Sequence, residues 1–221
     1  MIPNYFCRKI LSDDKLKYIR QLITAEDVEW NDGSLTVINE MLPQKKLFET
    51  FNQDIFDIIV SDLDNDMDFR SIVVPNETNN LIISKITEGG YYKCHLDSEL
   101  LGNYSTTIFL SEPDEYVGGD LQLLIDGDIK NFKLKAGWGI TYLTGIPHQV
   151  LSVTEGVRYA GVFWSTSIIS DPFMREIHYG LTNIQEKLKS SDTVYSNLKE
   201  FADDPIYEIE MLKKNIIRRY R

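Results

Sequence analysis

Of the three histidines in this chain of 221 residues, one stands two positions before an aspartate. His95 and Asp97 lie in residues 91–97, a segment that predicts an extended strand. Residues i and i+2 of a strand project to the same face, so both side chains are expected to point the same way. His148 begins another predicted strand, 51 positions after Asp97. The two imidazoles and the carboxylate are therefore candidates for one shared site.

Two imidazoles and one carboxylate on one side of a metal ion form a facial triad. Such a triad leaves three coordination positions open, which suits a non-haem Fe(II) ion that binds a chelating co-substrate and then O2. A structural zinc site would need a fourth ligand, and Cys94 is expected to face away from its strand neighbours. A short His-x-Asp motif also arises by chance, so an unrelated surface pair and a capping His148 stay open as the alternative.

Arg158 follows His148 by ten residues and starts a run of apolar and small residues. A turn around residues 154–156 predicts that this run returns antiparallel to the strand of His148. Arg158 would then lie deep in the fold, on the face that carries Ala160 and Trp164. A buried guanidinium needs an anion, and its planar donors match a carboxylate. The partner is either an internal acidic side chain or the distal carboxylate of a bound dicarboxylic co-substrate.

Short β-rich runs broken by Gly and Pro fill residues 72–168, and helical periodicity dominates on either side. Between two of these runs, Asp126-Gly127 predicts a hairpin turn. Many short strands at even spacing are typical of a barrel or a jelly roll, in which a later strand returns beside an earlier one. The best strand predictions are residues 81–86, 106–110, 120–125, 139–143 and 159–164.

We expect a single α+β domain over residues 1–221, with a double-stranded β-helix (jelly-roll) core and helices packed on it. The first helical run starts at a Ser12 cap, and a second carries apolar residues at helical spacing over 47–59. His178 falls in a later helical run, where a surface position is expected. The predicted parts are a helical N-terminal part (1–70), the jelly-roll core (72–168) and C-terminal helices (171–221).

Lys plus Arg total 23 and Asp plus Glu total 34, which gives a formal net charge of −11. A surface this acidic repels phosphate backbones and anionic lipids, so partners such as duplex nucleic acid or a membrane are not expected. No apolar run approaches the roughly 20 residues that span a bilayer, and the first residues lack the apolar core of a signal peptide. Two isolated cysteines fit a reducing compartment. We expect a cytoplasmic protein, with its oligomeric state open.

The order and spacing of these residues resemble a known family. His95-x-Asp97, then His148, then Arg158 in the pattern Arg-Tyr-Ala-x-x-x-Trp, is similar to the Fe(II)- and 2-oxoglutarate-dependent dioxygenases of the prolyl 4-hydroxylase type. The bacterial PKHD-type hydroxylases look nearest. The likeness extends over about residues 80–185 and includes two connecting segments, residues 107–121 and 136–142.

The resemblance implies that the chain is a 2-oxoglutarate-dependent non-haem iron dioxygenase. Fe(II) would be bound by His95, Asp97 and His148, and Arg158 would pair with the distal carboxylate of 2-oxoglutarate. O2 is the other implied co-substrate, ascorbate a candidate cofactor, and succinate and CO2 the co-products. The implied reaction hydroxylates an unactivated carbon, with a prolyl residue in a peptide or protein as the first candidate. A free amino acid or small metabolite as substrate, and a non-catalytic jelly-roll binding module, stay open.

Aromatic residues near the triad are implied to line the substrate side. Tyr92 and Trp164 match such positions in prolyl hydroxylases, although plain core packing explains them equally well. Phe109 stands where some relatives have a tyrosine that donates to the co-substrate carboxylate, and Thr107 on the same face is expected to replace it. These differences leave the iron chemistry in place and weaken the case for proline as the substrate.

Overall fold

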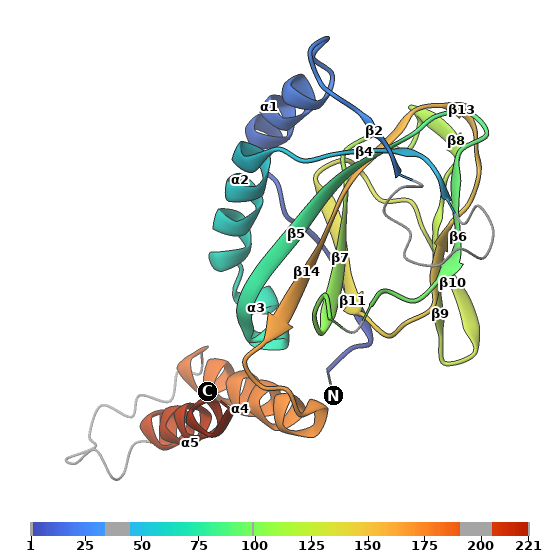
Figure 1. Ribbon diagram of the computed structural model, residues 1–221. Coiled ribbons are helices and arrows are strands. Elements are labelled where there is room, and N and C mark those ends of the chain that lie inside the picture. Colours follow the sequence, from blue (N-terminus) through green and yellow to red (C-terminus); the bar gives the residue numbers. More distant parts are fainter. Residues whose placement is uncertain (1, 34–44, 99, 191–204, 221) are drawn as a thin grey trace.

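The computed structural model describes residues 2–33, 45–98, 100–190 and 205–220 of the chain (Figure 1). Its strands form two antiparallel sheets that face each other, with a two-stranded ribbon of β8 (Tyr116–Gly118) and β13 (Val153–Gly156). The order in the larger sheet is β1 (Tyr5–Lys9), β11 (Trp138–Leu143), β7 (Tyr104–Phe109), β14 (Arg158–Ser167), β5 (Pro75–Ile86), β4 (Phe48–Thr50) and β2 (Asn31–Asp32). The order in the smaller sheet is β10 (Asp128–Phe132), β9 (Leu121–Ile125), β12 (His148–Val150), β6 (Tyr91–His95) and β3 (Lys45–Lys46).

Helices cover the outer face of the larger sheet and extend one end of the molecule (Figure 1). The helices on the sheet are α1 (Asp13–Ile23), α2 (Gln53–Asp64) and α3 (Met67–Val73), and those at the end are α4 (Pro172–Ser190) and α5 (Pro205–Tyr220). Ser12, Asn52 and Asp66 begin the first three helices, each side chain accepting a hydrogen bond from a backbone N–H three residues later. None of the helices in the described part of the chain is both long and apolar enough to cross a membrane.

Apolar side chains pack on both faces of the larger sheet. On its outer face, under the helices, Ile55 of α2 and Phe163 of β14 share one core cluster. On its inner face, Phe109 and Ile140 pack against Leu123 of the smaller sheet. Successive residues of a strand point to opposite faces, so one strand serves both cores. The space between the sheets is lined mainly by apolar groups, and polar groups placed there need partners.

The five predicted strands all appear in the structure, as parts of β5, β7, β9, β11 and β14. The predicted hairpin turn at Asp126-Gly127 joins β9 to β10, and both residues have positive φ angles, 54° and 85°. The first two helical runs correspond to α1 and α2. The α+β class and the jelly-roll core therefore follow from the strand pattern, and the extent of the domain over residues 1–221 stays a prediction.

The predicted helical N-terminal part, residues 1–70, also contains strands and is wrong to that extent. β1 pairs with β11 at an edge of the larger sheet, while the short strands β2, β3 and β4 add to both sheets. Strands of two to five residues are too short for an alternating pattern to stand out from the helical one. Residues 34–44 of this part, and 191–204 of the predicted C-terminal helices, lie outside the described residues.

The strand of Arg158 does not lie beside the strand of His148, in contrast to the prediction. β14 pairs with β5 and β7 in the larger sheet, whereas β12 lies in the smaller sheet between β9 and β6. The reason is β13, which pairs with β8 in a separate ribbon and carries the chain from one sheet to the other. Arg158 and His148 therefore border the space between the sheets from opposite sides.

Gly156, at the end of β13, turns the chain into the strand of Arg158. Its φ angle is +77°, and an added Cβ would lie 2.1 Å from the Glu115 carbonyl oxygen. Gly127 has a similar φ of +85°, but an added Cβ there meets nothing within 4 Å. We predict that Gly127→Ala lowers the free energy of unfolding by about 1–2 kcal/mol. Gly156→Ala should lower it by roughly 3 kcal/mol or more, because the clash adds to the same backbone strain.

Urea denaturation of the two glycine variants measures this difference directly. Equal losses in the two variants would contradict the close approach of Gly156 to the Glu115 carbonyl oxygen.

Candidate metal centre

His95, Asp97 and His148 come together between the two sheets. β6 and β12 are antiparallel neighbours, and their register sets His148 directly opposite His95. Asp97 follows the end of β6 by two residues, and its Oδ1 atom lies 3.6 Å from the Nε2 atom of each histidine. One ligand atom from each residue lies within 4.8 Å of the other two. Three ligand atoms at this spacing can bind one metal ion.

Backbone carbonyls fix the orientation of both imidazole rings. His95 Nδ1 lies 2.8 Å from the Lys93 carbonyl oxygen, and His148 Nδ1 lies 2.9 Å from that of Ile146. A carbonyl oxygen can only accept, so each Nδ1 carries the proton and donates it. The lone pair of each ring is then on Nε2, the atom that faces Asp97. This second hydrogen bond is typical of metal-binding histidines.

The Asp97 carboxylate is held by its outer oxygen, Oδ2. Ser105 Oγ donates to Oδ2 at 2.6 Å and Trp164 Nε1 donates to it at 2.8 Å. Burial alone would raise the pKa of Asp97, but the adjacent His95 and His148 and the bonds from Ser105 and Trp164 lower it to about 2. Asp97 is therefore ionised at neutral pH, with Oδ1 left free to bind a cation.

Aromatic contacts on either side keep the two imidazoles in place. The Tyr92 ring stacks on His95, with centroids 3.7 Å apart and an interplanar angle of 14°, and the Tyr142 ring lies 5.2 Å from His148. Burial lowers the pKa of His148, as does the neighbouring His95, against the opposing effect of Asp97. His148 is therefore neutral at physiological pH, which is the form that binds a metal.

Two nitrogen ligands and one carboxylate oxygen match the donor set of non-haem Fe(II) sites with open positions. A structural zinc site would need a fourth ligand, and the described residues place no further His, Cys, Asp or Glu in this group. Cys94 is exposed, as expected for the opposite face of the strand. The residues present therefore fit an iron ion with coordination positions left for other ligands.

Arg158 provides a buried cation on the opposite side of the same space. The residue is 1% exposed, and burial lowers the pKa of its guanidinium. No group in the described part of the chain accepts a hydrogen bond from its Nε or Nη2 atom. The Phe109 ring lies 5.3 Å from the guanidinium carbon. Buried donors without an acceptor are strongly unfavourable, so these donors fit a bound anion.

Comparison with known proteins identifies the family. No family model matches the sequence. A PKHD-type hydroxylase of Synechococcus sp. is 32% identical over 195 residues, which cover 81% of this chain and 85% of that protein. A second, from Thermosynechococcus vestitus, is 32% identical over 214 residues, covering 86% and 94%. The chain belongs to the PKHD-type hydroxylases. This membership confirms the predicted family and enzyme class, a 2-oxoglutarate-dependent dioxygenase.

The fold of the hydroxylase is shared with solved prolyl hydroxylases. A prolyl hydroxylase from Trichoplax adhaerens, in complex with a peptide fragment of the hypoxia inducible factor oxygen degradation domain, has a TM-score of 0.61 and 13% identity. The match covers 81% of this chain and 87% of the Trichoplax adhaerens chain. A Pseudomonas putida prolyl-4-hydroxylase has a TM-score of 0.53 and 15% identity, covering 74% and 92%. At these identities the likeness shows the fold alone, and it confirms the predicted jelly-roll core.

Sequence reasoning on the hydroxylase missed Ser105, which bonds to the outer oxygen of Asp97. The sequence shows only that Ser105 shares a strand face with Thr107 and Phe109, and its contact with Asp97 depends on the fold. Trp164 was predicted to line the substrate side, and in the structure its indole N–H donates a hydrogen bond to Asp97. Thr107 is buried, and its hydroxyl interacts with that of Tyr142. The roles of Thr107 and Trp164 toward bound molecules stay predictions.

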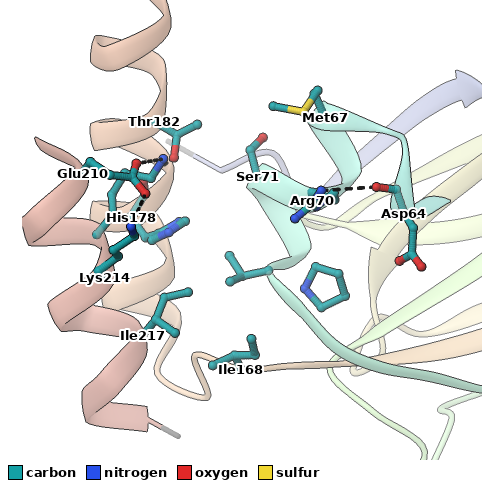
Figure 2. Close-up of a pocket in the computed structure, with 13 residues that line it drawn as sticks. Asp64, Met67, Arg70, Ser71, Ile168, His178, Thr182, Glu210, Lys214 and Ile217 are labelled. Carbon is teal, nitrogen blue, oxygen red and sulfur yellow. Dashed lines mark hydrogen bonds and ion pairs between the residues drawn. The ribbon is translucent and has the colours of Figure 1, made fainter. Parts of the chain in front are cut away.

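The third histidine of the hydroxylase lies in a groove of about 650 Å³ between α3 and the α4–α5 pair (Figure 2). His178 points into this groove and is only 7% exposed, although a surface position was predicted. The prediction was wrong because α5 packs against this face of α4, and helical spacing alone does not show which helix does so. Burial, together with the charge of Lys213, lowers the pKa of His178 to about 4. The groove shares no lining residue with the candidate metal centre.

Removing one donor to the outer oxygen of Asp97 should loosen this ligand. We predict that Ser105→Ala, and separately Trp164→Phe, weaken Mn(II) binding about 10-fold to 100-fold while the fold is kept. Ser165→Ala is the matched control, because Ser165 is buried on the same sheet and its hydroxyl pairs with Thr78 at 3.0 Å. Calorimetric titration with Mn(II) measures the affinity of all three variants. Unchanged affinity in both test variants would contradict a ligand role for Asp97.

Proposed function

We propose that this hydroxylase uses Fe(II), 2-oxoglutarate and O2 to hydroxylate an unactivated carbon of a prolyl residue in a peptide or protein. The observation that carries the proposal is the pairing of two sites in one space. On one side, three ligand atoms converge for a metal. On the other, a buried guanidinium has donors without an acceptor. 2-Oxoglutarate has a keto acid end that chelates iron and a distal carboxylate that suits the guanidinium.

Each residue of the site has a defined task in this proposal. His95, His148 and Asp97 hold the iron, and the backbone and side-chain bonds behind them keep their ligand atoms aimed at it. The bound iron supplies the oxidative decarboxylation of 2-oxoglutarate to succinate and CO2, with one oxygen atom going into the new hydroxyl group. Arg158 binds and orients the distal carboxylate. Thr107 lies on the same face of β7 as Phe109, whose ring is 5.3 Å from the guanidinium carbon.

The choice of a peptide substrate is supported by the surroundings of the triad and by a relative of the same fold. Tyr92 is only partly buried and presents its ring beside His95, so an aromatic surface borders the metal ligands. Such surfaces pack well against the apolar ring of proline. The Trichoplax adhaerens prolyl hydroxylase was solved in complex with a peptide fragment. Proline-containing peptides are therefore the first substrates to test.

Succinate formation tests the proposed reaction. We expect the wild-type protein, given Fe(II), ascorbate, O2 and 2-oxoglutarate, to release succinate when a proline-containing peptide from a library is present. His95→Ala and Asp97→Ala should abolish this release and Mn(II) binding, and circular dichroism should show the fold retained. Turnover only with free amino acids would contradict the peptide substrate. Full activity in either variant would contradict the metal site.

Arg158→Met separates anion binding from metal binding. We predict a loss of about 100-fold or more in 2-oxoglutarate affinity, because a charge-assisted pair is removed, with Mn(II) affinity unchanged. The free energy of unfolding without ligand should not fall, since an apolar side chain replaces a buried charge that lacks acceptors. Calorimetry and urea denaturation give the three quantities. A protein that loses metal binding and stability together would show that Arg158 is structural.

A further inference from the structure

A second buried donor, to which the proposed reaction assigns no role, lies beside Arg158. Tyr116 is 2% exposed, and its hydroxyl has no hydrogen-bond partner among the described residues. Tyr116 pairs with Gly156, two residues before Arg158, and its hydroxyl lies close enough to the Arg158 guanidinium for the two groups to interact. The Tyr116 hydroxyl and the Nε and Nη2 atoms of Arg158 all lack a hydrogen-bond partner among the described residues. A hydroxyl and a guanidinium in this arrangement can both be satisfied by one acceptor placed between them.

Phe109 explains why a second donor is needed beside Arg158. Its ring lies under the guanidinium and helps to hold it, but a phenyl ring offers no hydrogen bond to a carboxylate. A carboxylate has two oxygens with about four acceptor positions. The guanidinium alone leaves some of these positions unfilled.

Of the hydroxyls near the guanidinium, that of Tyr116 is best placed to donate. The Thr107 and Tyr142 hydroxyls interact with each other across neighbouring strands β7 and β11. The Tyr116 hydroxyl has no such partner. It comes from β8, a strand of the separate ribbon, and so approaches the guanidinium from outside the larger sheet.

The Tyr116 ring is held in place by its surroundings. It belongs to a buried cluster with Ile86 and Val153, and Lys133 lies over its face with Nζ 4.1 Å from the ring centroid. Lys133 Nζ also donates to the Tyr116 carbonyl oxygen at 2.7 Å. Gly119, at a φ of +66°, leaves room for the ring, since an added Cβ would lie 3.0 Å from it. A ring fixed in this way presents its hydroxyl at a constant position, which favours binding.

We propose that Tyr116 donates the second hydrogen bond to the distal carboxylate of 2-oxoglutarate, beside Arg158. This inference rests on the proposed function and assigns a further residue to the same site. The hydroxyl that Phe109 cannot provide from β7 is supplied from β8. Tyr116 thereby helps to select keto acids with an anionic tail from those with an apolar one.

Two ligands that differ only in the tail test this assignment. 2-Oxopentanoate has a methyl group where 2-oxoglutarate has its distal carboxylate, and both share the keto acid end. We expect Tyr116→Phe to weaken 2-oxoglutarate binding to the Mn(II)-loaded protein by about 10-fold to 100-fold, the effect of one hydrogen bond to a charged group. Binding of 2-oxopentanoate and of Mn(II) should not change.

Tyr159→Phe is the matched control, because Tyr159 is next to Arg158 on β14 but packs on the other face, where its ring lies 5.9 Å from that of Trp30. It should bind both keto acids as the wild type does. Tyr116→Phe with wild-type affinity for 2-oxoglutarate would overturn the assignment, as would an equal loss for both keto acids. If the wild-type protein itself fails to bind 2-oxoglutarate, the proposed function fails instead, so the two failures are distinguishable.

Discussion

A buried carboxylate and a buried guanidinium, held apart between two sheets, set the main physical constraint on this molecule. Asp97 and Arg158 do not neutralise each other: Asp97 interacts with the two histidines, and Arg158 has donors without an acceptor in the described residues. Charges in such surroundings are unfavourable unless each has a partner of its own. The jelly roll meets this constraint by carrying His95 and His148 on one sheet and Arg158 on the other. The space between the sheets is thereby suited to a cation on one side and an anion on the other.

Much of this arrangement could be predicted from the sequence, because the decisive residues are few and chemically distinctive. With three histidines in the chain, the His-x-Asp pair and the one later histidine that begins a predicted strand are the natural candidates for ligands. The strands of the core show clear β-rich runs between glycines, so β7, β9, β11 and β14 could be placed to within a few residues. The family resemblance added the proposed role of Arg158, because the spacing alone left its partner open between an internal acid and a bound molecule.

Other features could not be predicted, since they depend on which elements become neighbours. Ser105 is a common residue type in a strand, and only the fold brings its hydroxyl to Asp97. Tyr116 looks like a core residue, and its approach to Arg158 follows from the pairing of β8 with β13. The pairing of β14 with β7 rather than with the strand of His148 likewise depends on that ribbon. His178 becomes buried only because α5 packs along α4.

The polar atoms of the site are of two kinds: those with a hydrogen-bond partner in the protein and those without one. The outward atoms of the triad are satisfied within the protein: each histidine Nδ1 has a carbonyl, and Asp97 Oδ2 has two donors. The atoms without partners face the space between the sheets. At one side these are lone pairs, which bind a cation, and at the other they are N–H and O–H donors, which bind an anion. A metal with a chelating dicarboxylate satisfies both sides at once. A structural metal would satisfy only the first, and the unpaired donors of Arg158 and Tyr116 would then have no physical explanation.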